Sequence, residues 1–510
     1  METRDHKLGD KIYRPQRVKR HRLKRVLGVT ALYSAGYGNV GSSIYYALGL
    51  VAMVAAGATP VVLGIAGIIF VFNALTYAEG TSMFPEAGGS ATFARHAFSD
   101  LAGFTSGWAL IFSYIITLAI SAYIIPFYVG HFWAPLKESG ALGIFVAMGI
   151  IGFLMVVNVV GVKESSRLNW VMVIADLLTQ LLLVTLGFFL LFDKSIYVQR
   201  VVTNWPTTTN LIFGIAIAAI AYTGVETMSQ MAEETKKPEK QVPLALIFMM
   251  ITVIIIFASI STVAFSVMTP QQLATEWAAD PVAGIADGIY VYLTEHHPFA
   301  LQQSDISFFH ILQGFIIEGI RTFLRPLVAV LAATILLVAT NAALLGISRL
   351  TFSLGEHDLA PPVLSRIHPR FKTPYVAIII FCLVAILIQS QGLFGGNFLQ
   401  SLGGLYAFGS LLSFAFAHAS VLALRIKKPD MPRPFKAGLD IHIRGKSLPL
   451  VTILGLLSTI FVWIILLLAQ PNARWGGFAW MFIGFIIYYI YRKKSGTPLT
   501  RSIRKKRSIA

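Results

Sequence analysis

The chain contains about twelve apolar runs of about 20 residues, each long enough to cross the hydrocarbon core of a bilayer as a helix. The runs begin near Leu27, Pro60, Leu101, Leu142, Asn169, Asn210, Pro243, Phe323, Pro374, Phe398, Leu448 and Trp475. Of the 510 residues, 56% are hydrophobic and only 13% are charged, against about 25% charged in ordinary soluble domains. A lipid-exposed backbone must satisfy its own hydrogen bonds, so the pattern predicts an all-α integral membrane protein with about twelve transmembrane helices.

The basic residues gather in alternate loops and in both tails. There are 41 Lys and Arg against 24 Asp and Glu, a net charge of +17. The opposite loops are poor in positive charge, and the longest, 269–319, holds six acidic residues and no Lys or Arg. By the positive-inside rule both termini are cytoplasmic and the protein is a multi-pass protein of the plasma membrane. The charge therefore indicates topology and contact with the lipid bilayer, not binding to nucleic acid.

A glycine-rich stretch interrupts the first apolar run. Gly36, Gly38 and Gly41 crowd a span that a membrane helix should cross unbroken, and each interior glycine costs about 1 kcal/mol of helix propensity. We therefore expect a discontinuous helix whose free backbone groups face a bound solute or a water-filled cavity. The alternative is a packing seam of small residues, for which the spacing of these glycines is poor.

A second interruption is expected in the sixth run, where Gly224 stands among Tyr222, Thr223 and Glu226. An ionisable residue at membrane depth marks a functional site by default, because inserting it costs a few kcal/mol. If the first ten helices form two repeats of five, the first and sixth runs occupy corresponding positions. Breaks at corresponding positions of two repeats are the best sequence indication of a solute site in a transporter.

Several stretches together resemble the amino acid-polyamine-organocation superfamily. They are the glycine stretch 34–46, Tyr77-Ala-Glu79, Phe84-Pro-Glu-Ala-Gly-Gly-Ser-Ala-Thr-Phe-Ala94, Phe104-Thr-Ser-Gly-Trp108, Ala221-Tyr-Thr-Gly-Val-Glu226, Ala232-Glu-Glu-Thr-Lys-Lys-Pro238, Asn341-Ala-Ala-Leu-Leu-Gly-Ile-Ser-Arg349 and His368-Pro-Arg-Phe-Lys-Thr-Pro374. The resemblance implies the leucine-transporter-like fold, with helices 1–5 and 6–10 as inverted repeats, two extra helices, and discontinuous helices 1 and 6. It also implies solute transport by alternating access.

With this resemblance the chain divides into four parts. A basic cytoplasmic tail spans 1–26, and a ten-helix transporter core with the outer loop 269–319 spans 27–427. The two additional helices follow at 428–492, and a second basic tail occupies 493–510.

The chain departs from the family pattern at three positions. The usual Gly-x-Gly before Ile-Phe is replaced by Ser42-Ser43 before Ile44-Tyr45. In the fifth run Asp176 stands where the family often has a lysine, which resembles a built-in substitute for a coupling sodium ion. A buried carboxylate there could carry a proton, hold a cation, or only hydrogen-bond a neighbouring helix. The potassium-proton symporter branch typically has an aspartate where this chain has Asn39.

For an amino acid, the resemblance places the carboxylate on the N–H groups at Gly41, Ser42 and Ser43, and the ammonium near carbonyls of the two interruptions. The candidate substrate-binding residues are Tyr37, Gly38, Asn39, Gly41, Ser42, Ser43, Tyr46, Tyr222, Thr223, Gly224 and Glu226, with Tyr45 as a further candidate for selectivity. Asp176 and Glu226 are the candidate ion-coupling residues, with H⁺ as the expected coupling ion. Sodium coupling near Thr340 or Ser348 stays open.

Three charged residues near the ends of apolar runs, Glu79, Glu86 and Arg349, are expected to form gate or loop ion pairs, which contribute about 0–1 kcal/mol when exposed. The single cysteine, Cys382, excludes a disulfide framework and a cysteine metal site. The sequence carries no enzyme motif of the His-Glu-x-x-His, Gly-x-Ser-x-Gly or phosphate-loop type, so we expect neither catalysis nor a cofactor.

The sequence thus predicts a secondary active transporter, a proton-coupled amino acid permease. A potassium-proton symporter of the same superfamily is the alternative, followed by a polyamine transporter or a transport-fold sensor. A passive channel would not need two broken helices in matching repeats. The expected partner is a small solute, an amino acid or a cation, and the oligomeric state stays open.

Overall fold

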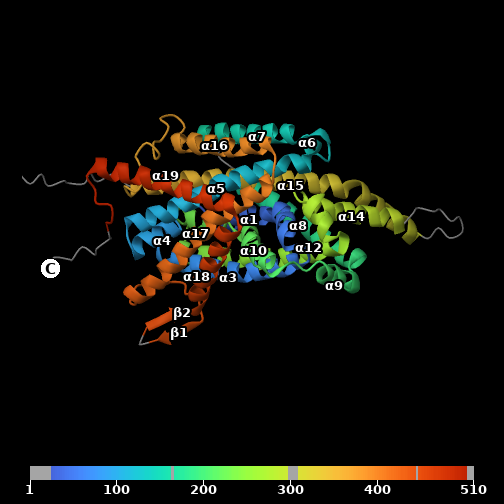
Figure 1. Ribbon diagram of the computed structural model, residues 1–510, viewed down its shortest axis with the longest axis horizontal. Coiled ribbons are helices and arrows are strands. Elements are labelled where there is room, and N and C mark those ends of the chain that lie inside the picture. The colour runs from blue at the N-terminus through green and yellow to red at the C-terminus, as the bar shows by residue number, and fades with distance from the viewer. Residues whose placement is uncertain (1–24, 162–165, 297–307, 444–445, 502–510) are drawn as a thin grey trace, which may run out of the picture.

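The computed structural model describes residues 25–161, 166–296, 308–443 and 446–501 (Figure 1). Most of the two predicted tails lies outside these ranges. The helices in chain order are α1 (Val29–Val40), α2 (Ile44–Ala55), α3 (Thr59–Met83), α4 (Ser90–Ala97), α5 (Asp100–Val129), α6 (Pro135–Glu138), α7 (Gly140–Val160), α8 (Ser166–Leu186), α9 (Lys194–Thr203), α10 (Thr208–Ala218), α11 (Val225–Gln230), α12 (Pro238–Val267), α13 (Pro270–Thr275), α14 (Pro281–His296), α15 (Phe308–Glu356), α16 (Tyr375–Ser390), α17 (Phe398–Lys427), α18 (Leu450–Ala469) and α19 (Pro471–Ser495).

Shorter helical turns join several of these helices. They are η1 (Gly41–Ser43), η2 (Ala56–Ala58), the π-helical η3 (Gly187–Leu191), η4 (Ala219–Tyr222), η5 (Ala232–Glu234) and η6 (Gln391–Phe394). Two short strands, β1 (Asp440–Ile443) and β2 (Lys446–Pro449), pair antiparallel between α17 and α18, with Asp440 opposite Pro449. This hairpin projects from one edge of the molecule (Figure 1).

Eleven stretches within the described ranges are long and apolar enough to cross a membrane. The first, Val29–Met83, contains two crossings, because Ala56 adopts a φ of 41° and turns the chain between α2 and α3. The all-α membrane protein of about twelve helices is therefore confirmed. The inverted repeat stays a prediction.

The eighth crossing belongs to a helix longer than its apolar run. The run was expected to begin near Phe323, but α15 already begins at Phe308, inside the segment assigned to the outer loop. No proline occurs between these positions to end the helix. The described part of that loop before residue 297 contains α13 and α14. The carbonyl oxygen of Ala278, between these helices, would lie 2.2 Å from a Cβ placed on Gly49.

Helix α5 lies at the centre of the bundle, packed against α15, α17, α4 and α7. Helices α7 and α16 lie side by side on one flank (Figure 1). Helix α1 packs against α12, α8, α15 and α11, so the first interruption lies among helices that are distant in sequence.

The two additional helices, α18 and α19, pack onto the core at glycines that lie directly against aromatic or imidazole rings. Gly455 of α18 faces the ring of His418, Gly477 of α19 faces Phe408, and Gly484 faces Trp108. Trp108 and Trp480 stack at 4.7 Å, and each indole N–H donates to the other residue's carbonyl, at 2.9 and 3.0 Å. Close approach at a glycine and this reciprocal pair fix the position of α19.

Substituting Gly484 with leucine should loosen this docking, because even a Cβ at that position would lie 2.2 Å from Nε1 of Trp108. We expect a loss of about 1–3 kcal/mol, the usual cost of overpacking, read as a lower melting temperature of the purified protein. Gly152→Leu is the matched control, because its Cβ would meet no atom within 4 Å. Equal melting temperatures for the two variants would contradict the proposed docking.

Candidate functional site

The first span is interrupted by a tightened turn and not by extended backbone. The 3₁₀ turn η1 separates α1 from α2, yet Val40, Gly41 and Ser43 all keep right-handed helical dihedrals, and the N–H of Gly41 still donates to the Tyr37 carbonyl. The ring of Tyr37 covers Gly41, where a Cβ would lie 2.5 Å from it. In this conformation the N–H of Gly41 is therefore not available to a substrate carboxylate, which differs from the arrangement expected from the sequence.

The two serines of the turn, Ser42 and Ser43, also form their side-chain hydrogen bonds within the first span. The Ser42 hydroxyl donates to the Asn39 carbonyl at 3.0 Å, and the Ser43 and Tyr46 hydroxyls lie 3.2 Å apart. A Cβ on Gly36 would lie 2.1 Å from the side chain of Met228 in α11, and a Cβ on Gly38 would lie 3.2 Å from Val338 of α15. The glycines thus also let neighbouring helices approach closely, as in a packing seam.

The sixth span is broken outright. Thr223 is extended, and Gly224 has a φ of 120°, a value that residues with a side chain rarely adopt. Helix α11 begins only at Val225. A Cβ on Gly224 would lie 2.8 Å from Val40 and 3.0 Å from Nδ2 of Asn39. The break in the sixth span therefore faces the end of α1, and the two interruptions meet as the sequence pattern suggested.

Glu226 and its neighbours form a buried polar cluster at this junction. One carboxylate oxygen of Glu226 accepts from the Gly224 N–H at 3.1 Å, while Oε1 is buried and accepts no hydrogen bond. The Asn39 amide donates to the Thr227 hydroxyl at 2.8 Å, but its Oδ1 has no donor, and neither amide atom of Gln230 has a partner. Unpaired buried acceptors are costly, so this cluster suits a ligand that brings hydrogen-bond donors or positive charge.

Asp176 lies on the other side of the first interruption and is fully buried. Its carboxylate accepts from the hydroxyls of Tyr37 at 3.0 Å and Tyr45 at 2.6 Å, and from the Gln180 amide at 2.7 Å. Tyr37 belongs to α1 and Tyr45 to α2, so this single carboxylate bridges both halves of the first span. The sequence analysis singled out Asp176 but did not assign this bridging pair to it.

Two further predicted site residues serve other contacts in this conformation. Tyr222 packs between Phe70 and Phe257, with both ring centroids at 5.3 Å. The Thr223 hydroxyl donates to the Ile220 carbonyl at 2.9 Å and hydrogen-bonds the Tyr406 hydroxyl of α17. Tyr406 was not selected from the sequence, where a tyrosine in an apolar run carries no distinguishing signal.

The three residues expected in gate or loop ion pairs lie in three different settings. Glu79 is completely buried and accepts two bonds from Arg425, at 2.7 and 2.9 Å, and one from the Ala437 N–H at 2.8 Å. Glu79 thus forms an ion pair, as expected, but a buried one, because the segment before the hairpin folds over it. Arg349 and Glu234 form a partly exposed pair at 2.9 Å, and Glu86 faces two histidines.

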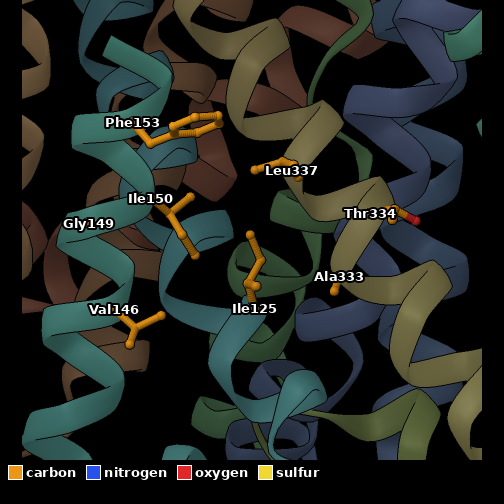
Figure 2. A pocket seen from close by; sticks show the side chains of 8 residues that line it. All are labelled: Ile125, Val146, Gly149, Ile150, Phe153, Ala333, Thr334 and Leu337. Carbon is orange, nitrogen blue, oxygen red and sulfur yellow. The ribbon is translucent and has the colours of Figure 1, made fainter. Parts of the chain in front are cut away.

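A separate cavity of about 590 Å³ opens between α5, α7 and α15 (Figure 2). Its lining residues are Ile125, Val146, Gly149, Ile150, Phe153, Ala333, Thr334 and Leu337. The one hydroxyl in this lining, that of Thr334, already donates to the Leu331 carbonyl at 2.9 Å. The cavity therefore suits apolar chains of lipid and not a polar solute.

The pattern of two facing interruptions with buried acids agrees with the comparison of the chain with known families. The family described as Amino acid permease matches residues 27–491. The chain belongs to this family, within the amino acid-polyamine-organocation superfamily. It is accordingly a multi-pass membrane transporter and not an enzyme.

Relatives of this permease are named for different solutes. The branched-chain amino acid permease of Bacillus subtilis is 28% identical over 92% of this chain and 94% of its own length. The methylthioribose transporter of the same organism is 26% identical over the same shares of each chain. The human cystine/glutamate transporter is 24% identical over 84% of this chain and 76% of its own.

Removing the Glu79 carboxylate should destabilise the permease strongly. In Glu79→Ala the buried guanidinium of Arg425 loses two of its bonds but retains Asp440, so we expect a loss of about 1–3 kcal/mol, less than the cost of a fully uncompensated buried charge. Glu234→Ala is the matched control, because its pair with Arg349 is partly exposed and contributes about 0–1 kcal/mol. Melting temperatures of the purified variants measure the difference, and a larger loss in Glu234→Ala would contradict this assignment.

Proposed function

We propose that this permease is a secondary active transporter that couples the movement of an amino acid to protons by alternating access. The observation that carries the proposal is the bridge from Asp176 to Tyr37 and Tyr45, on the two sides of the η1 turn. An ionised carboxylate accepts from both hydroxyls at once, whereas a protonated carboxyl becomes a donor itself and gives up part of its acceptor capacity. Protonation would thus loosen α1 from α2, the motion that alternating access requires.

The substrate is proposed to be a neutral, branched-chain amino acid. Its ammonium group would meet the unpaired Oε1 of Glu226 and Oδ1 of Asn39, both of which are buried acceptors. Its carboxylate would bind at the η1 turn after Tyr37 releases the Gly41 N–H. The similarity to a branched-chain amino acid permease along most of both chains supports this class.

A potassium-proton symporter is the second candidate. The same unpaired oxygens of Asn39, Glu226 and Gln230 favour it, because a hard cation prefers several oxygen ligands. Asn39 supplies a neutral oxygen where the potassium branch typically supplies a carboxylate, so the amino acid remains our first choice.

Replacing Asp176 with asparagine should separate coupling from binding. Asp176→Asn keeps the size of the side chain and can still accept from Tyr45, but it cannot carry a proton. In proteoliposomes we expect proton-driven accumulation of leucine to be lost while leucine-leucine exchange continues. Asp193→Asn, an exposed aspartate that caps α9, is the matched control. Undiminished accumulation in Asp176→Asn would exclude a coupling role.

A thermal-shift experiment distinguishes the two candidate solutes. A ligand that binds only the folded protein stabilises it by about 2.7 kcal/mol at one hundred times its dissociation constant. We expect a higher melting temperature with leucine, isoleucine or valine, which Glu226→Gln should lose and the exposed control Glu239→Gln should retain. Stabilisation by KCl, but by neither NaCl nor any of these amino acids, would favour the potassium-proton symporter.

A further inference from the structure

A carboxylate lies between two imidazoles where the α3–α4 loop meets the end of α15. Oε1 of Glu86 is 3.7 Å from Nε2 of His96 in α4, and Oε2 is 3.9 Å from Nε2 of His357, just after α15. Both separations exceed an ordinary hydrogen bond. Glu86 is thus placed to bind either ring, but at these distances it forms a hydrogen bond with neither. The basic loops assign this face to the cytoplasm.

The tautomer of His357 explains why its Nε2 forms no hydrogen bond with the Glu86 carboxylate. Its Nδ1 lies 2.7 Å from the Ser353 carbonyl oxygen, which can only accept, so Nδ1 carries the proton. In the neutral ring Nε2 is then an acceptor and faces another acceptor, the Glu86 carboxylate. Protonation of the ring puts a hydrogen on Nε2 and converts this contact into a charge-assisted hydrogen bond.

His96 is arranged to respond in the same direction. Its ring stacks on Phe84 with centroids 4.2 Å apart, and its Nε2 is buried without a hydrogen-bond partner. A cation over an aromatic face is attracted by the ring, and Glu86 lies on the side of Nε2. A protonated His96 would therefore gain both contacts together.

The pKa values of two acids in this cluster are shifted in opposite directions. Burial alone raises the pKa of Glu86, but the contact with His96 and the charges of His357 and Arg95 lower it below the ordinary value, so the carboxylate is ionised. Burial, followed by the charges of Glu356, Glu86 and Glu234, raises the pKa of Glu233.

The remaining charged groups lie on the elements packed around this cluster. They are Glu233 and Glu234 after α11, Glu356 and Arg349 of α15, Arg95 of α4, and Lys428 after α17, whose ammonium donates to the His96 carbonyl at 3.4 Å. Arg349 pairs with Glu234, and Arg95 pairs at 3.3 Å with Asp100, a carboxylate that also binds Arg492 of α19. The cluster therefore keeps negative charge while both imidazoles are neutral.

We propose that Glu86, His96 and His357 form a proton-operated clasp that ties the α3–α4 loop and α4 to the end of α15. The clasp closes when the two imidazoles take up protons as the pH on this face falls. It opens again as the pH rises, because the neutral rings lose the attraction to Glu86. The consequence rests on the proposed function: a carrier that brings protons in would be slowed by the acid it delivers.

Hydrogen exchange of the purified full-length protein tests the clasp without any substrate. The amides of residues 84–97 and 350–360 are followed at pH 5.5 and 7.5, with rates corrected for the intrinsic effect of pH. We expect roughly two- to tenfold more protection at pH 5.5, the range that one or two partly exposed ion pairs supply. Wild-type protection that does not change with pH would overturn the proposal.

Three variants assign the effect to its residues. Glu86→Gln, His96→Gln and His357→Gln should each reduce or abolish the gain in protection at pH 5.5, and Glu86→Gln preserves the size of the side chain. His442→Gln, an exposed histidine of β1, should keep the wild-type gain. A full gain in the His96→Gln, His357→Gln double variant would overturn the clasp.

Leucine uptake into proteoliposomes separates this inference from the proposed function. Protection that follows the expected pattern while leucine is not transported would contradict the amino acid assignment and support the clasp. Leucine transport combined with pH-independent protection would overturn the clasp and leave the proposed function standing.

Discussion

A polar group within the bilayer has no water to bond, and the rest of this structure follows from that constraint. It makes the twelve crossings helical, since a helix satisfies its own backbone. It also dictates how buried acids are held. Asp176 has three donors and Glu79 has a guanidinium and a backbone N–H. Glu226 differs from these two acids, because one of its oxygens has no donor. The unmet acceptor lies where the two interruptions meet, which is where we propose that the solute binds.

The two interruptions solve the same constraint differently. The sixth span breaks at Gly224, where a φ of 120° is accessible to glycine, and the side chain of Glu226 returns to cap the exposed N–H. The first span retains its helical hydrogen bonds through the η1 turn. Its glycines pack closely against side chains, Gly41 against Tyr37 and Gly36 against Met228. A helix that is tightened but not opened can change its shape with little loss of backbone bonding. The hydrogen bonds of Asp176 to Tyr37 and Tyr45 therefore span this tightened turn.

The ends of the spans are held by longer-range contacts. On one face Glu79 binds Arg425 and the segment before the hairpin, and the β-hairpin adds Asp440 to the same guanidinium at 3.0 Å. On the opposite face Lys137 reaches Asp280 at 2.6 Å and lies over the ring of Trp277, which fixes the segment between α13 and α14. These contacts join elements that are far apart in sequence and tie the loops to the ends of the spans.

The membrane class, the number of crossings, the family and the position of the break at Gly224 could all be predicted from the sequence, because hydrophobic length and glycine content act locally along the chain. The sequence also selected Asp176 and Glu226, since acids in apolar runs are conspicuous. The tyrosines that donate to Asp176 could not be predicted in the same way, because they come from other helices. Tyr45, Gln180 and Tyr406 look like ordinary residues in their own helices, and Glu79 looks like a loop acid until the segment before the hairpin covers it. A hydrogen bond between distant helices depends on how their faces pack, which no local pattern encodes.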